Sequence, residues 1–368
     1  MKEVSIIIPA YKAEKTIRKT VASISTQTVS DKVEVIVCSD NPSDDYSFLL
    51  ACFPDLDIKI LPTKINTGAG LARQRGLDVA TGKWAMFVDV DDLLADPFAI
   101  EFLLFDIKEG TVGVQSYFVD VSKKGNKYYF VKEMNVQHPW VFSRLYDISF
   151  LREHNIRFSD LRACEDTEFN WKFSYCVRKH GKNVKVVDHI GYYWFPSSDE
   201  SITRIGEKNG VPQYTYDFCR IGVLVATKRF IDFMRDNKAT EVELIEVILK
   251  CMLNNYVYYL SCLSCRKEFA QQNMWLAVYF YNEFYRNVEN KIANDYFTTE
   301  YKHTMEGAGV EIDEKVLKKY PFPVWLDIVK SQKYHLSDID KIRSKLDKKV
   351  KENDERYGFY IKCGNLFA

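Results

Sequence analysis

The sequence has no excess of charge of either sign, because 51 lysines and arginines balance 51 aspartates and glutamates. A net charge of zero gives the chain no global field that would attract nucleic acid or an anionic membrane, although a local basic patch is still allowed. The chain has 368 residues, of which 46% are hydrophobic and 28% are charged. These values are ordinary for a globular protein, and the length predicts two domains.

Two other features are missing, namely a disulfide framework and a long apolar run. The nine cysteines are odd in number and scattered, as in proteins with reduced cytosolic thiols. Cys262 and Cys265 have metal-ligand spacing, but no second pair completes a tetrahedral site. No secretory signal precedes the first expected strand, and a lysine and two asparagines interrupt the apolar residues 247–265. We therefore expect a cytoplasmic protein with no transmembrane segment, in which residues 247–265 form a buried helix.

Aromatic residues are abundant, with 23 tyrosines and 24 phenylalanines. They indicate large cores and a surface that stacks on carbohydrate or nucleic-acid bases.

The first part of the chain alternates between strand and helix patterns. Strands are expected at residues 4–8, 33–38, 58–61 and 84–88, the first of them ended by Pro9, and helices at residues 13–26, 45–52 and 71–80. Short connections between such elements predict a parallel α/β sheet of Rossmann-like type, in which ligands bind beyond the carboxyl ends of the strands. Polar loops at residues 9–11, 39–40 and 89–92 should therefore meet at one edge.

The strand at residues 84–88 ends in Asp89, Asp91 and Asp92. Like charges at the end of a buried strand are unfavourable unless a cation or a donor-rich ligand neutralises them. The cluster fits a hard divalent metal that also takes phosphate oxygens, although an isolated cluster of this kind is more often a solvated turn.

A second acidic group, Glu165 and Asp166, opens an expected helix. A helix N-terminus favours an ionised carboxylate, which a general base must be, although first-turn acids can also serve only as helix-favouring charges. Before this pair we expect a helix at 97–107, strands at 112–121 and 127–131 and a helix at 148–154, and after it a strand at 184–187.

From residue 211 onward the pattern is helical. Helices are expected at 214–235, 240–264, 268–285 and 337–353, with a loop around 307–309 and 321–323. No repeat and little strand signal occur in this part of the chain.

Four segments, at residues 4–11, 35–44, 66–82 and 87–92, resemble in their order and positions the nucleotide-sugar-binding half of family 2 glycosyltransferases with the GT-A fold. The resemblance runs from residue 4 to about residue 204. It implies a Rossmann-like mixed sheet flanked by helices in residues 1–210. Residues 211–368 lack the resemblance, and their helical pattern predicts a mainly α-helical domain that binds the acceptor or mediates homo-oligomer formation.

The resemblance also implies a donor site. Pro9, Ala10, Tyr11 and Asp40 would hold the base and ribose of a nucleotide sugar, and Arg73 would approach the base or the diphosphate. A solvated helix cation is the alternative reading of Arg73.

The aspartate loop would complete this donor site. Asp89 would bind the ribose or a water on the metal, Asp91 would ligate Mn²⁺ or Mg²⁺, and Asp92 would orient the loop.

On the acceptor side, the resemblance makes Asp166 the general base and Glu165 a neighbour that positions it or touches the acceptor. The polar segment 197–204 would close over the diphosphate, with Arg204 binding phosphate.

The expected function is therefore a metal-dependent inverting glycosyltransferase, with inversion implied by the resemblance alone. The donor would be a nucleotide sugar, most readily a UDP-sugar, and the acceptor a bacterial surface glycan or a teichoic-acid-type polymer. A phage-type enzyme that modifies hydroxymethylated bases in DNA is the alternative, and it should show salt-sensitive duplex binding. A non-catalytic GT-A-like glycan-binding module is the alternative of another class.

Overall fold

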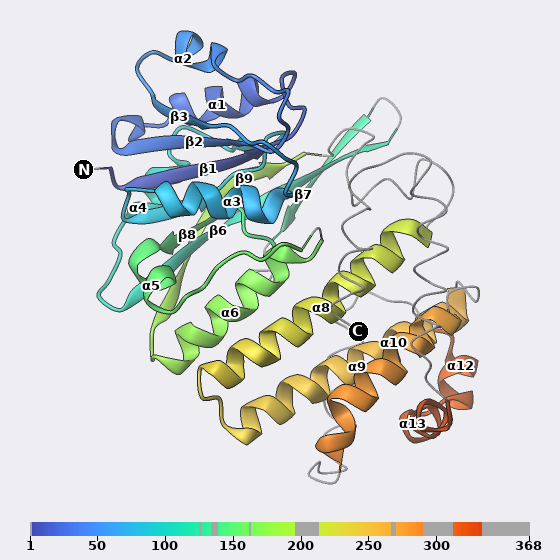
Figure 1. Ribbon diagram of the computed structural model, residues 1–368. Coiled ribbons are helices and arrows are strands. Elements are labelled where there is room, and N and C mark those ends of the chain that lie inside the picture. The colour runs from blue at the N-terminus through green and yellow to red at the C-terminus, as the bar shows by residue number, and fades with distance from the viewer. Residues whose placement is uncertain are drawn as a thin grey trace. The chain divides into compact units, whose positions relative to one another are not determined.

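The structure is a computed structural model that describes residues 2–124, 127–133, 139–161, 163–195, 213–265, 270–289 and 312–332. The chain divides into two compact units, Met1–Asn209 and Gly210–Ala368 (Figure 1). Each unit has its own hydrophobic core.

The first unit is built on one mixed sheet in the order β3-β2-β1-β4-β8-β6-β9-β5, with β7 paired to β6 outside this path (Figure 1). The β1–β2, β2–β3, β1–β4 and β6–β9 pairs are parallel, whereas β8 runs antiparallel to both β4 and β6. The strands are β1 (Val4–Ala10), β2 (Val33–Ser39), β3 (Asp57–Leu61), β4 (Trp84–Phe87), β5 (Leu93–Leu94), β6 (Thr111–Lys124), β7 (Lys127–Glu133), β8 (Arg144–Asp147) and β9 (Asn183–Trp194).

Helices flank this sheet. Strands β1 and β2 are buried along their whole length, as expected for the centre of a covered sheet. Ile17, Val21 and Ile24 form the buried stripe of α1, at the spacing that the sequence predicts. The helices are α1 (Ile17–Ser25), α2 (Phe48–Cys52), α3 (Ala69–Val79), α4 (Ala99–Leu104), α5 (Ile148–Glu153) and α6 (Glu165–Lys179), with a short 3₁₀ turn η1 (Ser30–Lys32).

The predicted fold class, an α/β mixed sheet flanked by helices and followed by a mainly helical region, is confirmed. The prediction that Pro9 ends the first strand is wrong, because β1 continues to Ala10. Pairing of β1 with β4 stops at Ile7 opposite Phe87, so Pro9 is paired with β2 alone. A residue without an N–H is tolerated where one side of a strand is open.

Two short strands escape the sequence pattern. The four residues of β8 and the two of β5 are too few to show a period, and both join the sheet through distant partners. The strand expected at 184–187 is in fact the start of the twelve-residue β9.

All regular secondary structure in the described part of the second unit is helical. The helices are α8 (Gln213–Asp236), α9 (Glu241–Cys265), α10 (Ala270–Glu283), the 3₁₀ turn η3 (Tyr285–Asn287), α12 (Glu314–Lys319) and α13 (Phe322–Ser331). The expected loop at 321–323 is the start of α13, because proline is accommodated in the first turn of a helix. The helix expected at 337–353 lies outside the described residues. Within the described ranges, no helix has the length and apolarity needed to cross a membrane.

The topology fixes which loops can meet. Strands β1, β2 and β4 are mutually parallel, so their carboxyl ends share one edge of the sheet. Strand β6 also ends at this edge, because β6 and β4 are both antiparallel to β8.

Candidate active site

The exits of β1 and β2 are joined by a hydrogen-bond network at this edge. The Asp40 N–H donates to the Ala10 carbonyl over 2.7 Å. Just beyond, Lys12 has a positive φ of 50°, and its N–H donates to Asp44 Oδ2 over 2.7 Å. The same oxygen accepts from the buried Tyr46 hydroxyl, which in turn accepts from the Ala13 N–H. The Asp44 carboxylate and the Tyr46 phenol together hold the turn at Lys12 and Ala13, next to the half-buried Tyr11.

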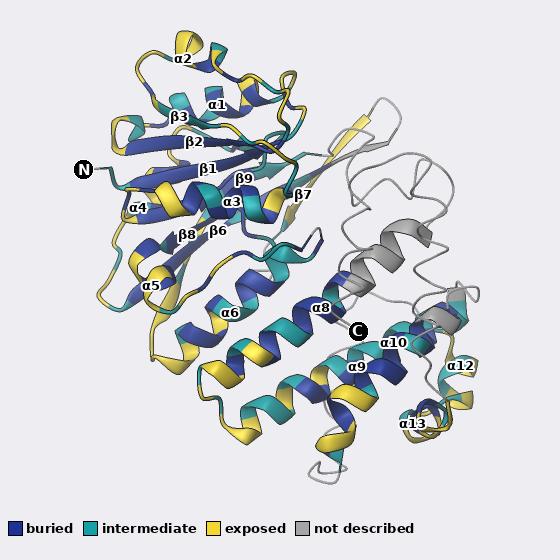
Figure 2. Cartoon of the chain, viewed as in Figure 1, coloured by how far each residue is buried: buried dark blue, intermediate teal, exposed yellow. Residues whose placement is uncertain are grey.

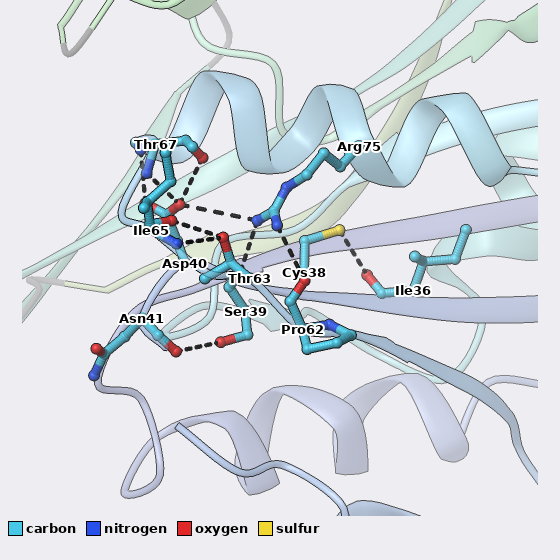
Figure 3. Close-up of polar contacts among 11 residues, drawn as sticks. Ile36, Cys38, Ser39, Asp40, Asn41, Pro62, Thr63, Ile65, Thr67 and Arg75 are labelled. Atoms are coloured by element: carbon cyan, nitrogen blue, oxygen red, sulfur yellow. Dashed lines mark hydrogen bonds and ion pairs between the residues drawn. The ribbon is translucent and has the colours of Figure 1, made fainter. Parts of the chain in front are cut away.

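Asp40 is buried, and its carboxylate is directed at the start of α3 (Figure 3). Oδ1 accepts from the Thr67 N–H and hydroxyl, and Oδ2 accepts from the Gly68 N–H, each over 2.7 Å. An anion is stabilised by free N–H groups at a helix N-terminus. Asp40 therefore already ties β2 to α3, and the predicted contact with the base or ribose stays a prediction.

The aspartate loop, residues 89–92, is held in place by α1 and β9. The Thr20 hydroxyl lies 2.9 Å from the carbonyl oxygens of both Val90 and Asp92. Asp89 and Asp91 are partly exposed, whereas the Asp92 side chain is buried. The loop therefore presents two carboxylates to solvent and turns the third inward.

The inward carboxylate of Asp92 meets β9. Its Oδ2 accepts from the Tyr192 hydroxyl over 2.7 Å and its Oδ1 accepts from the Phe195 N–H over 2.8 Å. The Asp89 N–H donates to the same Tyr192 oxygen over 3.1 Å. Burial and the charges of Asp89 and Asp91 raise the pKa of Asp92 well above its usual range. The hydrogen bonds from the Phe195 N–H and the Tyr192 hydroxyl oppose this shift.

Arg73 joins the aspartate loop to the start of α6. Its Nη2 lies 2.7 Å from Asp89 Oδ1 and its Nη1 lies 2.8 Å from Glu165 Oε1. The side chain is 7% exposed. Burial alone would lower the pKa of Arg73, but Asp89 and Glu165 raise it, so the guanidinium stays charged. The solvated-cation interpretation of Arg73 is therefore wrong.

Glu165 and Asp166 open α6, as predicted. Glycine at position 70 makes room for this pair, because a Cβ there would lie 2.9 Å from Glu165 Cγ. Burial, and next the charge of Glu165, raise the pKa of Asp166 to about 7, against the opposing effects of Arg73 and the Thr167 N–H. The helix N-terminus does not hold Asp166 ionised at low pH, because desolvation outweighs it.

A divalent metal fits this loop as a partial site only. Among the described residues, no three histidine, cysteine, aspartate or glutamate side chains are grouped to hold a metal ion. Asp89 and Asp91 are two partly exposed carboxylates, and Mg²⁺ is commonly held by one or two carboxylates together with substrate phosphates and water. The donor set fits a metal that arrives with a diphosphate.

Part of the predicted site is not among the described residues. Arg204 and the loop at 197–204 fall outside the described residues. Conversely, Thr20, Asp44, Tyr46 and Tyr192 organise the site without having been predicted. Each acts across a long sequence separation, up to 103 residues for Tyr192 and Asp89, and so leaves no local signal.

Comparison with known proteins gives a family match within the first unit and relatives that match part of the chain. Residues 5–167 match the family model described as glycosyl transferase family 2. The Escherichia coli UDP-Glc:alpha-D-GlcNAc-diphosphoundecaprenol beta-1,3-glucosyltransferase WfgD is 40% identical over 90 residues, covering 24% of this chain and 35% of that protein. The poly(ribitol-phosphate) beta-glucosyltransferase of Bacillus spizizenii is 25% identical over 211 residues, covering 54% and 33%.

The matches cover only 35%, 19% and 26% of the lengths of three curated relatives. Among solved structures, that of S. aureus TarS in complex with UDP-GlcNAc has a TM-score of 0.49 at 16% identity, covering 85% of this chain and 82% of that chain.

Proposed function

We propose, on the premise that residues 5–167 form a glycosyl transferase family 2 domain, that this protein transfers a sugar from a nucleotide-sugar donor to an acceptor hydroxyl. The observation that carries the proposal is the bridge that Arg73 makes between Asp89 and Glu165. It brings the loop suited to a donor diphosphate and the helix that carries a candidate base into one site.

The transfer can be written for named groups. The acceptor hydroxyl oxygen attacks the anomeric carbon while the bond from that carbon to the diphosphate oxygen breaks, and the acceptor proton passes to Asp166. With a pKa of about 7, Asp166 is a base near neutral pH and yet accepts a proton readily. Glu165 and Arg73 hold the start of α6 against the aspartate loop, so that the reacting groups are already positioned. Attack in line with the leaving group inverts the anomeric carbon.

Asp91 and the second oxygen of Asp89 would hold Mn²⁺ or Mg²⁺. When bound, the cation neutralises charge that develops on the leaving nucleoside diphosphate.

The donor and acceptor classes rest on the relatives. The Escherichia coli relative is named as a UDP-Glc-dependent enzyme and the Bacillus spizizenii relative as acting on poly(ribitol phosphate). We therefore infer a UDP-sugar donor and a bacterial surface glycan or teichoic-acid-type acceptor. The role of the helical unit in acceptor binding or oligomer formation also stays a proposal.

The proposal is tested by binding and turnover together. Calorimetry with UDP-, GDP- and CMP-sugars, with and without Mn²⁺, should show binding of a UDP-sugar that strengthens with the cation. Asp91→Ala and Asp166→Asn should each lower sugar transfer by at least about 100-fold in a folded protein. Absence of binding by every donor, or full transfer by either variant, would contradict the proposal. Nuclear magnetic resonance of the product anomer tests inversion separately.

A further inference from the structure

Five aromatic rings form a continuous cluster on one face of the sheet, beside the aspartate loop. Phe142 stacks on Tyr192 with ring centroids 4.7 Å apart, and the ring centroids of Trp140 and Trp194 are 5.2 Å apart. Phe118 packs edge-on against both Trp140 and Phe142. Phe118, Phe142 and Tyr192 are at most 3% exposed, whereas the two tryptophans are only partly buried. Trp140 and Trp194, the ring pair, are thus the accessible side of the cluster.

Each member of the ring pair is anchored to a different part of the proposed site. Trp194 lies between Tyr192, whose hydroxyl donates to Asp92, and Phe195, whose N–H donates to the same carboxylate. The Trp140 carbonyl accepts from Asn170 Nδ2 over 3.0 Å. Asn170 stands on α6 one turn beyond Asp166. The ring pair therefore connects the aspartate loop with α6, the helix that carries the candidate base.

A carboxylate lies next to the ring pair on the same face. Asp120 on β6 is directly paired with Trp194 on β9, so their side chains leave the sheet on one side. Asp120 Oδ1 is buried and has no hydrogen-bond partner within the part of the chain that the structure describes. A buried acceptor without a donor is costly, and a ligand hydroxyl would supply the missing donor.

The face continues onto β7, which Figure 2 shows as an exposed strand. Val131 is paired with Asp120, and Tyr129 lies two residues before it, so both share this face. They are 50% and 46% exposed. Exposed side chains that could contact a carbohydrate therefore continue beyond the ring pair along β7.

We propose that Trp140, Trp194 and Asp120 form the acceptor-binding platform, and that its ligand is a polyhydroxylated chain, a glycan or a polyol polymer. Flat rings offer their π faces to the C–H groups of a sugar or polyol, and the carboxylate accepts from its hydroxyls. An acceptor hydroxyl must lie between Asp166 and the donor sugar at the aspartate loop. The ring pair connects this loop with the helix that carries Asp166. This inference rests on the proposed function, since it names the acceptor side of that same site.

The test separates acceptor binding from donor binding in the full-length enzyme. Trp140→Ala, Trp194→Ala and Asp120→Asn are assayed with UDP-Glc as donor and two acceptor probes, poly(ribitol phosphate) and a short-chain prenyl diphosphate carrying GlcNAc. Each variant should raise the acceptor KM at least about tenfold, because removal of a stacked tryptophan commonly dominates a binding energy. The dissociation constant for UDP and the rate of UDP-Glc hydrolysis by water should stay within about twofold of the parent enzyme.

Matched variants control for loss of packing. Trp140→Phe and Trp194→Phe keep a flat ring and should recover most of the acceptor affinity. Phe105→Ala removes a 69% exposed ring that follows α4, outside the ring cluster, and should leave the acceptor KM unchanged. Should an alanine variant fail to fold, Asp120→Asn, which is expected to raise the acceptor KM, carries the comparison.

Several results would overturn the platform. They are an unchanged acceptor KM in folded variants, and a UDP dissociation constant that rises as much as the acceptor KM. An enzyme that hydrolyses UDP-Glc but glycosylates neither probe would overturn the acceptor class and leave the donor site standing. A parent protein that neither binds UDP nor splits UDP-Glc would instead overturn the proposed function itself.

Discussion

At the scale of single residues, Arg73 shows how one side chain can couple two halves of a site. Its two terminal nitrogens each meet a different carboxylate, Asp89 and Glu165. A planar guanidinium presents several donors in a rigid fork, whereas an ammonium is a single compact charge. The geometry of the bridge therefore depends on arginine and not only on positive charge.

Arg73→Lys should lower kcat/KM for sugar transfer by about 100-fold, because lysine cannot reach both carboxylates and leaves one of them without its partner. Steady-state kinetics of purified variants checks this. Arg157→Lys is the matched control, since Arg157 pairs with Asp78 over 3.0 Å at an exposed position and should change little. Equal activity of both variants would show that the bridge has no role in transfer.

Asp166 predicts the pH dependence of the reaction. A base with a pKa of about 7 is protonated below that pH, so kcat/KM should fall about tenfold for each pH unit below 7 and level off above it. The profile is measured with donor and acceptor well below saturation. A plateau that extends down to pH 5 would exclude Asp166 as the titrating base.

The same shift affects stability. The pKa of Asp166 is raised from 3.8 in the unfolded chain to about 7 in the folded protein, so ionisation destabilises the fold increasingly as pH rises from 3.8 to 7. Asp166→Asn mimics the protonated carboxyl and should therefore unfold at a higher temperature than the parent at pH 8, with little difference at pH 4. Calorimetric melting at both values tests this, and a lower melting temperature at pH 8 would contradict it.

At the scale of elements, Glu34 on β2 ties several parts of the sheet together at the edge opposite the site. Its buried carboxylate accepts from the Ser5 hydroxyl, from the Thr81 and Gly82 N–H groups and from Lys59. Burial would raise the pKa of Glu34, but the bonds from Lys59, Ser5 and Thr81 outweigh it and lower the pKa to about 2. This network holds the turn that follows α3 onto β1 and β2.

Glu34→Gln should lower the free energy of unfolding by about 2 to 4 kcal/mol at neutral pH, because a buried hydrogen-bonded charge is lost. The contribution of Glu34 is complete above pH 4.5 and is lost as pH falls from 4.5 toward 2, so the two proteins should converge in that range. Urea denaturation at pH 7 and pH 3 measures this. Glu3→Gln, which removes an exposed pair with Lys32, should cost less than about 1 kcal/mol.

At the scale of the whole molecule, the balance of charge bears on the DNA-modifying alternative. The formal net charge is zero, so a polyanionic duplex gains no long-range attraction. We expect no retardation of a 30-base-pair duplex in gels at about 50 mM salt, where non-specific binders still hold DNA. Salt-sensitive binding would favour the DNA-modifying alternative over a surface-glycan acceptor.

The fold class followed from the sequence because its signals are local. Each buried strand and each amphipathic helix of the first half carries its own hydrophobic period, and β1 to β4 were found within a residue or two, apart from the extension through Pro9. The short β5 and β8 were not found, since their pairing depends on partners about 30 to 100 residues away.

The candidate site divides in the same way. Sequence alone determined where the aspartate loop and the Glu165–Asp166 pair lie along the chain, because strand ends and helix starts have recognisable residues. Only the tertiary structure decided that Arg73 links them, that Tyr192 supports Asp92, and that Asp166 has a pKa of about 7. The physical reason is that hydrogen bonds and desolvation depend on the distance between side chains in space, which the fold sets and the order of residues does not display.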